Sequence, residues 1–230
     1  MRSSVALTRA LALTMATALI FTASFAFYRT VIVATAQKIE PSGQLIELAI
    51  DNGQADCASG AAPPTEEHPV EPVFGWANKL TPATYPATLR SVTIGFNRSG
   101  PLVEPDLLYQ IVVYLDPEMD GPSTGQTAAA TFTGRLRGGE SFMTFNLVSP
   151  LSINEGSFIV GVIDTQRVGG FPALFDSPGR SDPPGSESFI TTNGGNLWRT
   201  FRDTLPEGSP CTAGSFLIRA TVETDPVDTF

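Results

Sequence analysis

Three acidic side chains at alternate positions could bind a calcium ion. Asp116, Glu118 and Asp120 are spaced in this way, and Gly121 follows them. This is the first half of a calcium-binding loop, in which alternate oxygens converge on the cation. The second half differs, because the position of the usual bidentate glutamate is Thr127. Ordinary turn acidity is therefore the preferred interpretation; calcium at this loop is the alternative, and no other cofactor is expected.

A serine lies in a glycine-flanked string that occurs in many hydrolases. Residues 121–125 match the G-x-S-x-G pattern around Ser123. A nucleophile elbow also needs a strand-to-helix turn and a histidine later in the chain. The only histidine, His68, precedes the serine, and Pro122 favours a hairpin. We predict a turn here and name no catalytic residue.

Four aromatic side chains are candidates for binding a flat ligand such as a sugar ring. Aromatic faces stack on apolar ring faces, and pockets commonly contain such platforms. A β domain also needs large side chains for its own core, so core or loop packing is the alternative for each. Trp198 is the first to test, because a turn directly precedes it. The four candidates are Trp198, Trp76, Tyr85 and Phe171.

The N-terminal segment has the order of an export signal. Arg2 and Arg9 precede an uncharged apolar run over residues 10–27. Small residues favour cleavage after residue 36, with residues 24–26 as a weaker alternative site. An uncleaved membrane anchor through the apolar run is also open, because the run is long enough to span a bilayer. In either case we expect a secreted, periplasmic or cell-surface protein, with membrane contact only through this run.

Two cysteines lie in the exported part of the chain. Cys57 and Cys211 are expected to form a disulfide, because extracytoplasmic compartments are oxidising. The bond would connect the loop after the first strand to the start of the last strand. Two cysteines and one histidine do not make a zinc site.

The charge balance excludes one class of partner. The chain has 23 acidic and 14 basic side chains, and cleavage after residue 36 would remove three arginines. Lys38 and Lys79 would be the only lysines left. No basic stripe remains for a phosphate backbone, so we expect no nucleic acid partner. The acidity is interpreted as solubility outside the cell.

Alternating apolar and polar residues predict an all-β domain. The alternation is clear in residues 215–223, 91–96 and 143–147. Residues 107–115 and 158–163 are instead continuous apolar runs, which are typical of central strands covered on both faces. Shorter expected strands are 45–50, 74–79, 128–133 and 188–192. Many short strands separated by turns predict a two-sheet antiparallel jelly-roll-like sandwich behind an N-terminal export helix.

Two segments are expected to be long loops. Residues 51–72 and 164–187 contain several prolines and glycines and show no alternation. Long loops on a rigid sandwich often bind ligands, and they also often cover a sheet edge. Both interpretations stay open.

Several short stretches resemble a known kind of module. They are Glu47 to Gly53, Tyr85 to Leu89, Val113 to Asp116, Phe158 to Val162, Ser188 to Gly195, Trp198 and Ile218 to Ala220. On these stretches the chain is similar to a jelly-roll or galactose-binding-like β-sandwich that recurs in secreted bacterial proteins. The resemblance implies a structural module with no catalytic residues to carry over.

A second, local resemblance is to the Asp-box hairpin of sialidase-like propellers. Thr191, Asn193, Gly195 and Trp198 match its positions, with asparagine at the acidic position and Leu197 where a hydroxyl residue is usual. A single copy implies a hairpin turn and does not imply a glycosidase.

These observations divide the chain into an export segment or anchor (residues 1–36), a sandwich domain (37–224) and a short tail (225–230). We expect a noncatalytic extracytoplasmic module that binds a ligand, such as a carbohydrate, or has a structural role at the surface. One alternative is a secreted hydrolase with a carboxylate pair in the long loops. The other is a surface protein that self-assembles or docks on a partner protein through an exposed strand edge.

Overall fold

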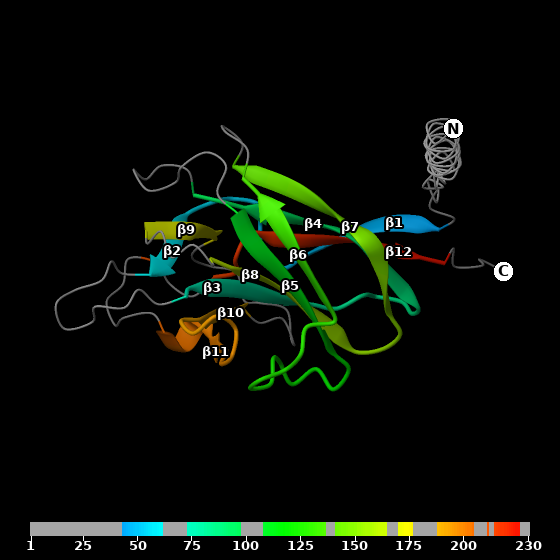
Figure 1. Ribbon diagram of the computed structural model, residues 1–230. Coiled ribbons are helices and arrows are strands. Elements are labelled where there is room, and N and C mark those ends of the chain that lie inside the picture. The colour runs from blue at the N-terminus through cyan, green and yellow to red at the C-terminus, as the bar shows by residue number, and fades with distance from the viewer. Residues whose placement is uncertain are drawn as a thin grey trace, which may run out of the picture. The chain divides into compact units, whose positions relative to one another are not determined.

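Two antiparallel sheets face each other in the computed structural model (Figure 1). The structure describes residues 43–61, 73–97, 108–136, 141–164, 170–176, 188–204, 211 and 214–225. In chain order the elements are β1 (Gln44–Ala49), β2 (Cys57–Ala61), β3 (Gly75–Leu80), β4 (Ala87–Gly95), β5 (Leu108–Asp116), β6 (Ala130–Arg135), β7 (Phe142–Ile153), β8 (Ser157–Ile163), β9 (Gly170–Phe175), β10 (Ser188–Thr191), β11 (Arg199–Thr200), the 3-10 helix η1 (Phe201–Thr204) and β12 (Ile218–Thr224).

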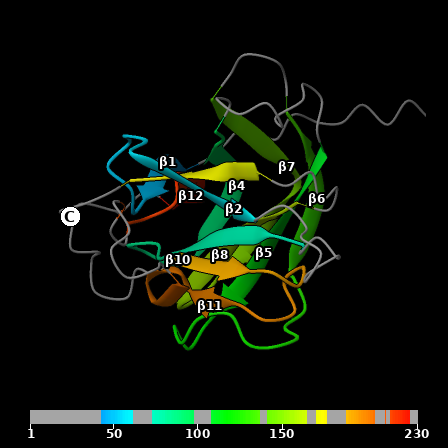
Figure 2. The same cartoon turned by 90° about the vertical axis from the view of Figure 1, so that its left-hand side faces the viewer.

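The strand order defines an all-β sandwich of the expected jelly-roll-like type. One sheet has the order β1-β12-β4-β7, and the other has the order β11-β10-β3-β8-β5-β6. Figure 2 shows them as separate layers, with β1, β12, β4 and β7 in one and β10, β8, β5 and β11 in the other. The first and last strands, β1 and β12, pair along their length. The fold class predicted from alternation is confirmed.

Alternation along β12 and β4 creates the interior between the sheets. Ile218, Ala220 and Val222 of β12 are buried, while Arg219 and Thr221 between them are partly exposed. Side chains of successive strand residues point to opposite faces, so this pattern requires one covered and one wetter face. The buried row packs against the other sheet, as the sequence pattern predicts.

The continuous apolar runs form central strands that are covered on both faces. Every residue of β8 is buried, and β8 lies between β3 and β5. Its outward-facing residues Ile159 and Ile163 join a second apolar cluster with Val112, Tyr114 and Trp198. The loop between β5 and β6 and the β10–β11 hairpin contribute to this cover. The expectation of central strands is confirmed.

The two predicted long loops each contain a strand. β2 falls within residues 51–72 and β9 within residues 164–187, and the two strands pair with each other. Neither alternates: β2 reads CASGA and β9 reads GFPALF, so small residues, glycine and proline hide the strand period. The expectation of irregular loops over these stretches is therefore wrong for residues 57–61 and 170–175.

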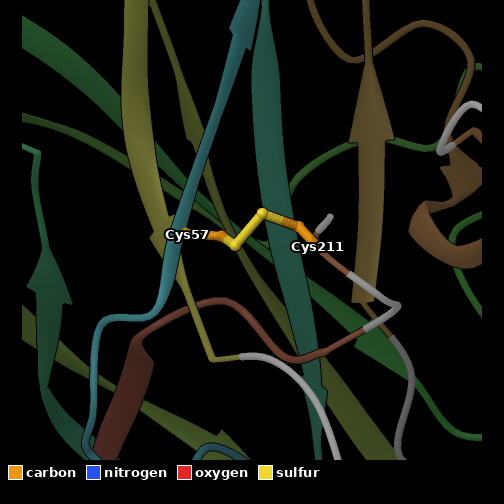
Figure 3. Close-up of a disulfide and its surroundings, with 2 residues drawn as sticks. All are labelled: Cys57 and Cys211. Carbon is orange, nitrogen blue, oxygen red and sulfur yellow. A yellow bond between two sulfur atoms is a disulfide. The ribbon is translucent and has the colours of Figure 1, made fainter. Parts of the chain in front are cut away.

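A disulfide connects β2 to the segment that precedes the last strand. Cys57 and Cys211 are bonded across 154 positions of sequence, as the sequence predicts. Figure 3 shows the two side chains pointing toward each other, with Cys57 at β2. Both cysteines pack against the main apolar core. The bond therefore links the small β2–β9 sheet to the end of the chain that forms β12.

The predicted export segment, residues 1–36, lies outside the described residues, as do His68 and most of the expected tail. All described strands lie between Pro41 and Phe230. Over the part of the chain that is described, there is no helix with the length and apolarity needed to cross a bilayer.

Candidate binding groove

An open groove of about 380 Å³ lies between the edges of the two sheets. One wall is residues 129–132, at the start of β6, and the other is residues 147–151 of β7. Figures 1 and 2 both place β6 and β7 side by side. The walls consist of small or apolar residues and two hydroxyl residues: Ala129, Ala130, Thr131, Phe132, Leu147, Val148, Ser149, Pro150 and Leu151. None of these nine described residues is charged.

A bulge in β7 makes one wall. Asn146 pairs with Ser91 and Leu151 pairs with Leu89, so residues 147–150 of β7 lie opposite the single residue Arg90. Extra residues in one strand bend it and leave its backbone outside the ladder. Val148 at this bulge is 98% exposed, an unusual position for a large aliphatic side chain. The bulge therefore projects an apolar side chain beside the groove.

The other wall is the start of an edge strand. β6 pairs with β5 over Ala130 to Arg135, and no described strand pairs with it on its other side. An edge strand has alternate backbone N–H and C=O groups that point away from its partner. The groove thus combines an apolar surface with backbone hydrogen-bonding groups.

The two tryptophans that were candidates for ligand binding are in cores. Trp76 is fully buried between the sheets, where its ring contacts Phe74, Phe96 and Tyr109. Trp198 is 7% exposed and covers Gly161 on the outer face of the six-stranded sheet. Their ring faces are therefore covered by protein, so the structure supports the core-packing alternative for both.

The other two aromatic candidates are exposed but far apart. Tyr85 and Phe171 are 41% and 56% exposed. Tyr85 precedes the start of β4. Ala173, two residues after Phe171 on β9, bridges to Phe96 beyond the end of β4. Nine strand residues span about 30 Å. The four candidates therefore do not converge on one platform.

The acidic side chains proposed for calcium do not converge either. Asp116 is buried, and its carboxylate accepts hydrogen bonds from the Gly121 backbone N–H and from the Ser157 hydroxyl. Glu118 and Asp120 are exposed. Within the described ranges, no group of three or more histidine, cysteine or acidic side chains is placed to hold a metal. Asp116 instead closes the turn that follows β5.

The segment resembling an Asp-box forms a hairpin between β10 and β11. The Asn193 side-chain oxygen accepts hydrogen bonds from the Thr191 hydroxyl and from the Leu197 backbone N–H. The Thr191 hydroxyl accepts from the Gly195 N–H. Gly194 and Gly195 both have positive φ, which suits glycine. Asparagine therefore performs the loop-closing role of the usual acidic residue.

Two other buried carboxylates also stabilise the backbone. Asp51 accepts hydrogen bonds from Gly53 and forms an ion pair with Arg219. Asp176 accepts from the backbone N–H groups of Asn52 and Ser215. It joins the turn after β1, the end of β9 and the segment before β12. These carboxylates have structural partners, and Asp51 raises the pKa of Arg219 through its hydrogen bond.

Tyr114 lies under Trp198, and its burial predicts that the folded protein loses stability at alkaline pH. Burial raises the pKa of Tyr114, and the Trp198 side chain partly opposes this effect. A phenol with a raised folded-state pKa contributes fully to stability below its ordinary pKa of about 10, and this contribution is lost as pH rises through the folded-state value. Between about pH 9 and about pH 11, the free energy of unfolding measured in urea should fall less in Tyr114→Phe than in the wild type. Equal losses would contradict this assignment.

The groove has no signature in the sequence that predicts it. Its walls are the outer strands of two different sheets, β6 of one and β7 of the other, which only the tertiary structure brings together. The available signal was Val148 followed by Ser149 and Pro150, an exposed-edge pattern of an apolar residue and a proline directly after the expected strand 143–147.

Comparison with solved structures gives two matches, and the first of them adds support for the fold. The clostridial cysteine protease Cwp84, after propeptide cleavage, matches with a TM-score of 0.54 and 17% identity, over 79% of this chain and 40% of that chain. A structure of the cysteine protease and lectin-like domains of Cwp84, a surface layer associated protein of Clostridium difficile, matches with a TM-score of 0.48 and 20% identity, over 66% and 32%. This chain thus spans less than half of either matched protein. No protein-family model and no curated protein matches the sequence.

The class defined by this fold is a two-sheet antiparallel β-sandwich with a disulfide. At these identities the likeness to Cwp84 concerns the fold alone.

Proposed function

We propose that this chain is a noncatalytic extracytoplasmic binding module. The observation that carries the proposal is the groove between β6 and β7, whose nine described lining residues are uncharged. Each of these two strands is held in place by pairing within its own sheet. Its volume lies within the range of about 300–1,000 Å³ found for ligand sites. The disulfide supports a location in an oxidising compartment, secreted, periplasmic or on the cell surface.

Three buried carboxylates have structural roles, which supports a role without catalysis. Asp51, Asp116 and Asp176 are buried and accept hydrogen bonds from backbone groups. A glycosidase pair needs two carboxyl groups on either side of a substrate bond, one of them available as an acid. Groups held in this way stabilise turns and are poor candidates for that task.

A panel of ligands tests the proposal. The purified domain should bind members of a glycan array or of a library of uncharged synthetic peptides, and it should release no reducing ends from polysaccharides. Val148→Asp should weaken the binding, since a carboxylate at the groove wall needs hydration that a bound ligand would remove. Turnover of a polysaccharide, or the absence of binding to both panels at millimolar ligand, would contradict the proposal.

A further inference from the structure

We propose that the groove binds an extended, uncharged polypeptide segment, which adds to the six-stranded sheet as a strand beside β6. This inference rests on the proposed function and names the ligand class of the same site. Strand addition needs an open sheet edge with an adjacent surface for side chains. The first half of β6 and the β7 bulge provide these two elements.

β6 differs from the other outer strands of the two main sheets. β11 is two residues long, β1 carries the charged residue Glu47, and β7 is interrupted by its bulge and by Pro150. Short length, charge, bulges and proline are the features that protect edges from pairing. β6 has no proline, and its one charged residue, Arg135, is at its last position, beyond the residues that line the groove. It is therefore the edge best suited to accept a further strand.

The chemistry of the walls selects an uncharged peptide. None of the nine lining residues is charged, so a charged ligand side chain would lose hydration without gaining a partner. The chain as a whole has a net charge of −9, which further disfavours an anionic ligand. Thr131 and Ser149 can exchange hydrogen bonds with polar side chains of the peptide.

A peptide also fits better than a sugar. Phe132, the aromatic residue of the lining, is partly buried and packs against the main core, so its ring is not a free stacking platform. The outward backbone groups of β6 repeat at the spacing of another strand. Six residues of β6 extend over about 20 Å, which matches a peptide of similar length.

A second copy of the chain fits less well. A stable dimer buries roughly 1,000 Å² or more, well beyond what nine residues of a groove provide. A narrow extended segment needs only the groove itself.

Two variants of the full chain distinguish binding at the groove from binding elsewhere on the surface. Val148→Asp places a carboxylate on the groove wall at a residue that is 98% exposed. Leu45→Asp is the matched control, because Leu45 is 50% exposed on β1, at the other edge of the four-stranded sheet. The probes are a library of uncharged fluorescent heptapeptides and a panel of neutral oligosaccharides, with affinity measured by anisotropy or competition.

We expect heptapeptide binding that Val148→Asp weakens at least about tenfold and Leu45→Asp leaves unchanged. Methylation of single peptide nitrogens provides a test of strand addition. Only alternate N–H groups of an added strand donate to β6, so N-methylation should weaken binding at every second residue and have little effect between.

Other results would overturn the inference in distinguishable ways. Oligosaccharide binding that Val148→Asp abolishes, without heptapeptide binding, would keep the proposed function and reject the peptide. Neither ligand class binding at millimolar concentration would reject both. A dimer in light scattering that Val148→Asp dissociates, without peptide binding, would assign the groove to a second copy. Uniform effects of N-methylation along the peptide would reject strand addition.

Discussion

Replacing both cysteines, in the variant Cys57→Ser with Cys211→Ser, is expected to lower the free energy of unfolding by about 5 kcal/mol. The disulfide closes a loop over 154 positions of sequence, so its loss returns much conformational freedom to the unfolded chain. The bond also connects β2 to the segment before β12 across a partly buried contact. Urea unfolding of the variant and of the oxidised wild type provides the measurement.

The reduced wild type is the control for this prediction. If the effect comes from the cross-link, then wild-type protein unfolded in the presence of a reductant should match the double variant. A loss below about 1 kcal/mol in the double variant would show that the bond does not restrict the unfolded chain as expected.

Trp76→Ala is expected to cost about 3 to 5 kcal/mol of unfolding free energy. The indole of Trp76 is fully buried between the two sheets and contacts Phe74, Phe96 and Tyr109. Its removal leaves a cavity that the flanking β strands cannot close, because pairing holds β3 to β8 and β10. Thermal and urea unfolding both report this loss.

Phe171→Ala is the matched control, because it removes another candidate aromatic that is 56% exposed. We expect a change within about 0.5 kcal/mol for this variant. Similar losses in Trp76→Ala and Phe171→Ala would contradict the division of the aromatic candidates into core and surface residues.

Most of the fold could be predicted from alternation and apolar runs. Ile218, Ala220 and Val222 show a period of two because one face of β12 is covered and the other is wetter. The continuous run of β8 identified a strand covered on both faces. β2 and β9 escaped prediction because small residues, glycine and Pro172 give no alternating pattern, and their strand conformation depends on their pairing with each other.

The sites were less predictable than the fold. Residue type made Trp76 and Trp198 candidates for stacking on a ligand, yet both rings are buried in the two apolar clusters of the protein. The spacing of Asp116, Glu118 and Asp120 suggested a cation site. In the structure the Asp116 carboxylate instead accepts hydrogen bonds that close the turn after β5. The groove depends on two edges meeting, which is a property of the sheet order and not of any local motif.

Backbone amide chemical shifts during a titration with uncharged heptapeptides test the central claim most directly. The account predicts shifts concentrated at residues 129–135 of the β6 edge and at residues 147–151 of the β7 bulge, with slower hydrogen exchange of the outward β6 amides. Shifts centred on Tyr85, Phe171 or the β10–β11 hairpin, or an unchanged β6 edge at saturating ligand, would contradict it.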